Sequence, residues 1–283
     1  MKSISFFMLF ALLLLSCQNE NTKNKKLIQK ETISQKTTMV INKKFQQILN
    51  AAELNGVLLV FDPQTQTYTS NDFSRSKKGF LPASTFKIPN SIIALETGIV
   101  KDENTISKWD GKKRFLKIWE QDLTFKNAFK MSCVPCYQDI ARQIGAKRMN
   151  EYLKKLDYKN MVVDDVSIDN FWLKGDSRVS AMEQIDFLFR LYYSKLPISK
   201  RTEKILKDMM LIHEKTNYKW SGKTGWAVAG KKNLGWFVGY LEQGDNVYFM
   251  ATNVEPKENF EMKKFSKIRM QVMEEAMKVF NDE

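Results

Sequence analysis

Two short segments far apart in this chain carry residue types that could together perform nucleophilic chemistry. In the first, Ser84 and Lys87 stand three residues apart, so on a helix their hydroxyl and amine share one face. In the second, residues 223–225 read Lys-Thr-Gly, which offers an ammonium, a hydroxyl and a strand edge without a side chain to an anionic substrate. Together they favour a serine nucleophile that is activated by lysine and acts on an acyl group beside a carboxylate.

The Ser-x-x-Lys spacing occurs a second time, at Ser74 and Lys77. That copy lies in a polar, charged stretch and is predicted to be a solvated loop. Ser84, in contrast, precedes an apolar run over residues 88–96 that indicates a buried helix. Pro89 fits the first turns of such a helix, where few backbone donors are lost. The alternative for Ser84 is a capping serine at an ordinary helix N-terminus.

A histidine-based hydrolase would depend on one residue, because His213 is the only histidine of the chain. Its surroundings predict a helix end, where a protonated imidazole can satisfy backbone carbonyls. The same count argues against a histidine-rich metal centre, and neither a metal nor an organic cofactor is expected. If Ser84 is a nucleophile, Lys87 is then the nearest candidate for its base.

The elements that must position these residues predict an α+β fold. Strand patterns come first and last in the chain, at residues 57–61, 65–70, 218–225, 234–241 and 247–254. Helical patterns fall at residues 84–97, 125–131, 137–156, 180–193, 203–212 and 260–280. We therefore expect one antiparallel sheet, formed by both chain ends and flanked by terminal helices, beside a mainly helical lobe. The active site is expected in the cleft between them.

The first 17 residues are predicted to be a signal peptide. Lys2 precedes an apolar run over residues 4–15 that is too short to span a bilayer. The run leads to Leu-Leu-Ser-Cys, which resembles a bacterial lipobox and implies cleavage before Cys17 and a lipid on its sulfur; a plain secretory signal is the alternative. Residues 18–38 are polar and predict a flexible tether to a domain over residues 39–283. An exported, periplasmic, membrane-anchored lipoprotein is thus expected.

The formal net charge of +13 raises nucleic acid as a possible partner. Lysine greatly outnumbers arginine, which is the better reader of bases and phosphates, and the lysines are scattered along the chain. The charge is therefore interpreted as a solvated basic surface, and no nucleic-acid partner is expected.

Two cysteines, Cys133 and Cys136, remain if Cys17 is lipidated. In an exported protein such a pair is either a disulfide or two free thiols, and the residues alone leave both open. Zinc is not expected, because one histidine and two cysteines make a poor set of ligands.

Five motifs, in order and spacing, resemble the class D (oxacillinase-type) serine β-lactamases of the penicillin-binding-protein/transpeptidase-like superfamily. The likeness runs from about Leu58 to Met277. The motifs are the active-site segment at residues 81–90, Ser-x-Val at residues 132–134, Trp-Leu at residues 172–173, Lys-Thr-Gly at residues 223–225 and the next sheet strand at residues 234–239. One departure is Tyr158-Lys159-Asn160, where the family has Tyr-Gly-Asn, which puts the role of that loop in question.

The resemblance implies a catalytic role for each matched residue. Ser84 would attack a β-lactam carbonyl and form an acyl-enzyme, with the backbone N–H groups of Ser84 and Trp226 as the oxyanion hole. Lys87 would be N-carboxylated by CO2 and act as the general base, with the indole of Trp172 holding the carbamate. Ser132 would relay a proton to the lactam nitrogen. The residues that the resemblance places around the substrate are Val134, Leu173, Lys223, Thr224, Gly225 and Arg269.

Two other functions share these motifs: a penicillin-binding D,D-peptidase and a β-lactam sensor domain. A peptidase usually carries Asn where this chain has Val134, and a sensor needs transmembrane signalling helices, whereas this chain offers only an export segment. The resemblance therefore favours an enzyme that hydrolyses small-molecule β-lactam antibiotics. The residues indicate neither its preferred β-lactams nor its oligomeric state.

Overall fold

The computed structural model describes residues 37–230 and 232–281, of which those from Met39 onward belong to one compact unit. The predicted signal peptide, Cys17 and nearly all of the predicted tether lie outside the described residues. Within the described part, no helix is at once long and apolar enough to cross a membrane.

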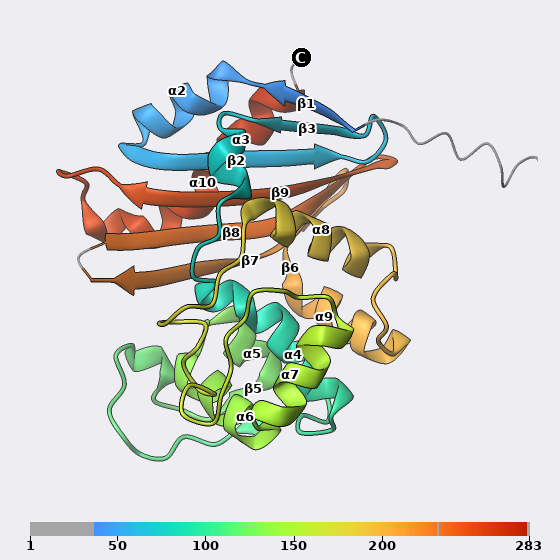
Figure 1. The fold of residues 1–283 in the computed structure, drawn as a ribbon, viewed down its shortest axis with the longest axis vertical. Coiled ribbons are helices and arrows are strands. Elements are labelled where there is room, and N and C mark those ends of the chain that lie inside the picture. The colour runs from blue at the N-terminus through green and yellow to red at the C-terminus, as the bar shows by residue number, and fades with distance from the viewer. Residues whose placement is uncertain (1–36, 231, 282–283) are drawn as a thin grey trace, which may run out of the picture. The chain divides into compact units, whose positions relative to one another are not determined.

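A seven-stranded sheet lies at the centre of the described chain, in the order β1-β3-β2-β9-β8-β7-β6 (Figure 1). Its strands are β1 (Thr38–Ile41), β2 (Leu54–Asp62), β3 (Thr67–Ser70), β6 (Leu211–Lys215), β7 (Tyr218–Ala229), β8 (Lys232–Gln243) and β9 (Asn246–Pro256). β2 pairs with β9 in antiparallel register, with Leu54 opposite Pro256, so early and late strands are neighbours. The predicted α+β fold, with a sheet formed by both chain ends, is confirmed.

The sheet separates two hydrophobic cores, one on each face, so its central strands are buried on both sides. In β2, Val57 and Leu59 face one core, and Leu58 and Val60 face the other, as strand alternation requires. The helices α2 (Lys43–Ala51) and α10 (Phe265–Asn281) supply the second core.

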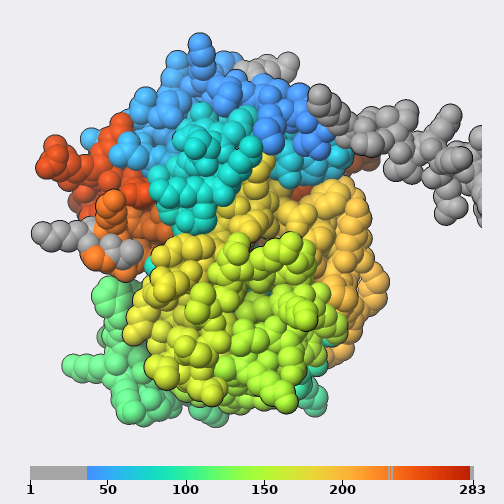
Figure 2. Space-filling view, viewed as in Figure 1, coloured from blue at the N-terminus to red at the C-terminus, as the bar shows by residue number. Residues whose placement is uncertain are grey.

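α8 covers the opposite face of the sheet, and the helical lobe lies on the β7 side of the sheet (Figure 1). Figure 2 shows yellow segments beside the blue and teal N-terminal part, with the green segments at the opposite end of the molecule. The elements on this side are α3 (Phe73–Lys77), the 3-10 turn η1 (Ala83–Phe86), α4 (Lys87–Glu96), β4 (Ile106–Ser107), the 3-10 turn η2 (Lys117–Trp119), β5 (Leu123–Thr124), α5 (Phe125–Lys130), α6 (Val134–Ile144), α7 (Ala146–Lys155), α8 (Ala181–Tyr192) and α9 (Lys200–Met210).

Two predicted helices are wrong in their extent. The helix expected over residues 137–156 is two helices, because Gly145 with φ of 77° ends α6 and starts α7. The helix expected from residue 260 begins as α10 at Phe265, after a 3-10 turn over Met262–Lys264.

Two structural predictions around single residues are also wrong. His213 does not lie at a helix end: α9 ends at Met210, and His213 is exposed on edge strand β6 opposite Trp220. Its chain changes from helix to strand because it pairs with β7, a tertiary contact that local pattern does not report. The second Ser-x-x-Lys copy forms the short helix α3 rather than a loop, capped by the Asp72 side chain, with Ser76 buried.

Candidate active site

Ser84 and Lys87 meet at the junction between η1 and α4. Lys87 Nζ donates to Ser84 Oγ at 3.3 Å, and both residues are buried. The N-cap of α4 is Phe86, and Ser84 lies inside the preceding 3-10 turn, so the alternative of an ordinary capping serine is wrong. The preceding Ala83 has φ of 52°, a backbone strain of the kind that is held at functional sites.

The strained turn is held from three sides. Ala83 N donates to the Trp172 carbonyl at 2.8 Å, and the buried Gln184 on α8 donates to Thr85 Oγ1 at 2.7 Å. On the third side β7 packs against the turn at Gly225, where a Cβ would lie only 3.2 Å from Thr85 and 3.3 Å from Ala83. The glycine of the Lys-Thr-Gly motif therefore lets the sheet reach the serine turn.

Lys87 is almost fully buried. Its Nζ is 4.7 Å from the ring centroid of Tyr137, whose hydroxyl shares a 2.7 Å hydrogen bond with Ser91 Oγ. Burial lowers the pKa of Lys87 to about 7, because desolvation penalises the ammonium form. A neutral amine, able to accept a proton, is thus available beside Ser84 near neutral pH.

Trp172 stacks on Phe86, the residue before Lys87, with ring centroids 5.5 Å apart. Among the described residues its buried Nε1 finds no hydrogen-bond partner, and neither does the buried amide of Asn90, one turn after Lys87 on α4. An unsatisfied buried donor costs about 1–3 kcal/mol, so this pocket has polar groups ready for a further partner. Leu173 follows Trp172 and is half-buried against the same core.

A second serine–lysine pair stands across the site. Lys223 Nζ donates to Ser132 Oγ at 2.6 Å, and Ser132 has φ of 55° just before α6, where Val134 is the first residue. Burial, then the charges of Lys87 and Arg269, hold the pKa of Lys223 well below its usual value. These crowded basic groups make a pocket that favours an anionic ligand.

Strand alternation places Lys223 and Thr224 on opposite faces of β7, with Lys223 toward the helical lobe. β6 pairs with β7 only as far as Ser221. Within the described chain, the edge of β7 that faces β6 is therefore unpaired from Gly222 onward. Both residues line a cavity of about 290 Å³ at this edge, together with Phe129, Lys130, Met209, Met210, Leu211, Ile212, Gly222 and Met270. Ser84, Lys87 and Ser132 are not among the lining residues of this cavity, which lies at the Lys223–Thr224 end of the candidate site.

Arg269 is buried on α10, and its side chain reaches strand β7. Its guanidinium donates to the carbonyl of Gly225, and to those of Phe265 and Ser266 on its own helix. Gly235 on β8 makes room for it, because a Cβ there would lie 2.7 Å from Cγ and Cδ of Arg269. Trp226, the next residue of β7, exposes 37% of its surface, and its ring centroid lies 5.6 Å from the Arg269 guanidinium.

The structure joins Cys133 and Cys136 in a disulfide, which decides the question that the sequence left open. Cys133 is also the N-cap of α6, and its Sγ accepts from the backbone N–H of Cys136 at 3.2 Å. The bond closes the first turn of α6 directly after Ser132.

We expect a Cys133→Ser/Cys136→Ser double variant to keep most of its activity and to lose stability. Serine can still cap α6, and the sulfurs contact no catalytic group, whereas opening so short a loop costs about 2 kcal/mol in the chain-entropy model. Thermal unfolding and steady-state kinetics on the same preparation check this. Lost turnover at an unchanged melting temperature would contradict it.

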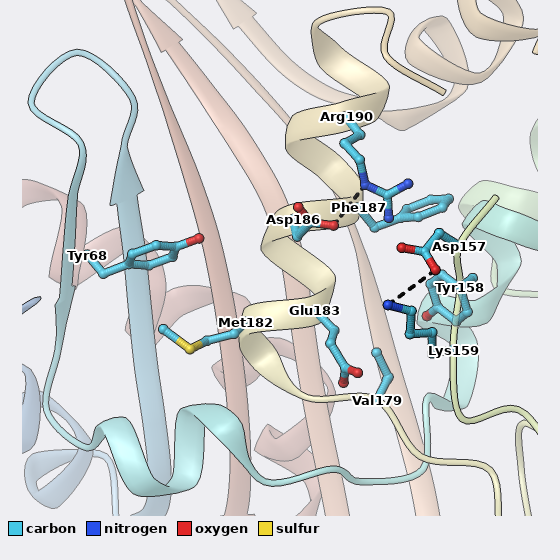
Figure 3. A pocket seen from close by; sticks show the side chains of 10 residues that line it. All are labelled: Tyr68, Asp157, Tyr158, Lys159, Val179, Met182, Glu183, Asp186, Phe187 and Arg190. Atoms are coloured by element: carbon cyan, nitrogen blue, oxygen red, sulfur yellow. Dashed lines mark hydrogen bonds and ion pairs between the residues drawn. The ribbon is translucent and has the colours of Figure 1, made fainter. Parts of the chain in front are cut away.

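The loop with Lys159 differs from the family pattern without strain at that residue. Positive φ values occur on either side, at Asp157 and Asn160, while Lys159 is exposed and pairs with Asp157 at 3.3 Å. Figure 3 shows this pair beside α8, where it lines a cavity of about 280 Å³. Tyr158 points inward and packs edge-on against Phe86, so the loop supports the serine turn from behind.

Sequence reasoning missed two residues of the site, Tyr137 and Gln184. Tyr137 reads as helix core, and Gln184 as a polar position within a helix, so nothing in their local pattern marks them. Only their contacts with Lys87 and Thr85, from other elements, show their place.

Known proteins of related sequence fall into one group of enzymes. The family model of the penicillin-binding protein transpeptidase domain matches residues 37–278. β-lactamase OXA-10 of Pseudomonas aeruginosa is 42% identical over 217 residues, which cover 76% of this chain and 80% of that protein. β-lactamase OXA-48 of Klebsiella pneumoniae is 43% identical over 216 residues, with the same coverage.

A solved structure agrees. That of FUS-1 (OXA-85), a class D β-lactamase from Fusobacterium nucleatum subsp. polymorphum, aligns with a TM-score of 0.79 and 37% identity, over 85% of this chain and 98% of that chain. The chain belongs to the class D β-lactamase family. The resemblance drawn from five motifs and the prediction of a β-lactamase enzyme are confirmed.

Proposed function

We propose that this class D β-lactamase hydrolyses β-lactam antibiotics through an acyl-enzyme on Ser84, and so confers resistance to them. The observation that carries the mechanism is the buried Ser84–Lys87 pair, in which the pKa of Lys87 is lowered to about 7. A serine without a histidine needs such a base, since an ordinary lysine is protonated at neutral pH.

In acylation, Lys87 accepts the proton of Ser84 as its Oγ attacks the lactam carbonyl carbon. The backbone N–H groups of Ser84 and Trp226 receive the oxygen as it becomes negative. When the C–N bond breaks, Ser132 Oγ passes a proton to the lactam nitrogen and is reprotonated by Lys223 Nζ, its hydrogen-bond donor. The proton held by Lys87 replaces that of Lys223, which leaves Lys87 unprotonated again. Lys223, Thr224, Gly225 and Arg269 hold the substrate carboxylate at the open edge of β7, with Val134 and Leu173 against its apolar part. In deacylation, Lys87 takes a proton from the water that attacks the acyl carbon and returns it to Ser84 Oγ as the acyl–oxygen bond breaks.

The pocket of Lys87 also fits N-carboxylation by CO2. Only a neutral amine captures CO2, and a pKa of about 7 leaves a large fraction of Lys87 neutral near pH 7. The buried Nε1 of Trp172, which has no hydrogen-bond partner among the described residues, is a donor suited to a carboxylate oxygen. When present, the added carboxylate supplies an anionic oxygen base in place of the amine. The proposal involves no metal and no organic cofactor.

Turnover separates this proposal from its alternatives. The purified chain should hydrolyse a chromogenic cephalosporin over many cycles. A single stoichiometric burst followed by a stable adduct would favour a D,D-peptidase or a sensor domain.

We also propose that the protein is exported to the periplasm and anchored there by a lipid on Cys17. The support is the apolar run over residues 4–15 and the lipobox-like segment that ends it. Mass spectrometry of the mature N-terminus tests this, since a plain secretory protein would carry no diacylglyceryl group.

We expect Arg269→Ala to raise KM for carboxylate-bearing β-lactams about 10- to 100-fold with kcat little changed. A hydrogen bond to a charged group contributes about 1.5–3 kcal/mol, and a contact that binds ground and transition states equally appears in KM. Steady-state kinetics check this, with cooperative melting as the control for the lost carbonyl contacts. An unaltered KM in a folded variant would mean that Lys223 and Thr224 suffice.

A further inference from the structure

The loop between β4 and β5 presents apolar side chains to solvent. This 108–122 loop is the green loop at the foot of the view in Figure 1. Phe115 is 93% exposed, and Leu116 and Ile118 are 40% and 48% exposed. Exposed apolar side chains that gather at one place among polar residues mark interaction sites.

The tip of the 108–122 loop is held in place by its base. Arg114 N donates to the carboxylate of Glu120 at 3.0 Å. The indole of Trp119 donates to the Met131 carbonyl at 3.0 Å, and its ring packs against the core. The exposed side chains are therefore already positioned, so little ordering is needed when they meet a partner.

The charge of the tip is positive. The 108–122 loop has five basic and three acidic residues, and Asp110 and Asp122 are both ion-paired within it. In the described part of the chain, neither Lys113 nor Lys117 is in ion-pair contact with a carboxylate, and both are exposed. They stand on either side of Phe115 and Leu116, so the tip combines apolar side chains with uncompensated cations.

We propose that the 108–122 loop binds the surface of an anionic membrane, with Phe115 and Leu116 at the acyl boundary and Lys113 and Lys117 at lipid phosphates. Shallow apolar insertion flanked by cations is how peripheral proteins bind such surfaces. Three side chains cover far less than the roughly 800 Å² that each partner contributes to a specific protein interface. The loop contact does not depend on the lipid proposed at Cys17 and would add to that anchor.

A polarity-sensitive fluorophore on the full chain tests the contact directly. It is attached to Phe115→Cys and, as a matched control, to Val166→Cys, a residue 90% exposed on another loop. Because Cys17 and the N-terminus are the same in both, any difference belongs to the labelled position. With vesicles that contain phosphatidylglycerol, emission should shift to the blue and rise at least about twofold at position 115 only, and 0.5 M salt should reverse much of this.

Vesicle sedimentation supplies the second measurement. Phe115→Ser/Leu116→Ser and Lys113→Gln/Lys117→Gln should each weaken partitioning to phosphatidylglycerol vesicles about tenfold relative to the parent, with hydrolysis in solution unchanged. Equal responses at positions 115 and 166, or equal binding to pure phosphatidylcholine, would overturn the proposal. So would a Phe115→Ser/Leu116→Ser variant that binds vesicles normally but has a raised KM for β-lactams with bulky apolar acyl groups, because the loop would then be a substrate wall.

Discussion

Replacing Ser84 with alanine is expected to lower β-lactam turnover about 10⁴-fold or more and to prevent covalent labelling. Ser84 Oγ is the hydroxyl next to the Lys87 amine, and removing the nucleophile of such a unit removes its whole contribution. Steady-state kinetics give the loss of turnover, and intact-mass spectrometry after penicillin exposure gives the loss of the adduct. The substitution removes one hydroxyl, adds no atom and leaves the backbone bonds of η1 in place, so the variant should fold.

The chain offers a matched control in its second Ser-x-x-Lys copy. Ser74→Ala removes an exposed hydroxyl with the same spacing to a lysine, in α3, and should leave both measurements unchanged. A penicilloyl adduct that persists on Ser84→Ala would reject Ser84 as the nucleophile.

Turnover is expected to depend on dissolved CO2 and on the protonation of Lys87. With a pKa of about 7, the amine is increasingly protonated as pH falls, so kcat/KM should drop by up to about tenfold per pH unit below 7. Acid should also release captured CO2, and bicarbonate should restore activity in degassed buffer. The measurements are pH–rate profiles with and without bicarbonate, and NMR with ¹³C-bicarbonate to detect the modified lysine.

Two substitutions of Trp172 test the carboxylated-lysine mechanism most directly. Trp172→Phe keeps an aromatic ring against Phe86 and removes the buried N–H donor, whereas Trp172→Ala removes both. Both should slow deacylation more than acylation, and added bicarbonate should partly restore them. If turnover is indifferent to bicarbonate in the parent and both variants, and no ¹³C signal appears, the modified-lysine mechanism is wrong and Lys87 acts as an ordinary amine.

The parts of the site that the sequence predicted are those set by local spacing. Ser84 and Lys87 are one turn apart whatever surrounds them, and the Lys-Thr-Gly segment sits on a strand whose pattern is plain. Strand alternation and apolar runs likewise predicted the sheet and its two ends. Family motifs added Ser132 and Trp172, which no spacing connects to Ser84.

What could not be predicted depends on contacts between distant parts of the chain. Gln184 holds Thr85 across 99 residues, and only the folded chain brings them together. The reach of Arg269 to the Gly225 carbonyl depends on the absence of a side chain at Gly235, which the sequence shows only as another glycine. The prediction of a helix end at His213 is wrong for the same reason: the strand that holds His213 forms by pairing with β7, which lies later in the chain.

The pairing of β2 with β9 has a consequence for how the enzyme is made. Loop closure over such a separation is costly in entropy, so the sheet forms late and the chain is expected to fold slowly. Until residues 246–256 have left the ribosome, β2 is paired with β3 alone, and nothing joins it to β8 and the Lys-Thr-Gly strand β7. A chain truncated before β9 therefore leaves strand edges of β2 and β8 unpaired, and we expect it to aggregate rather than form a working site.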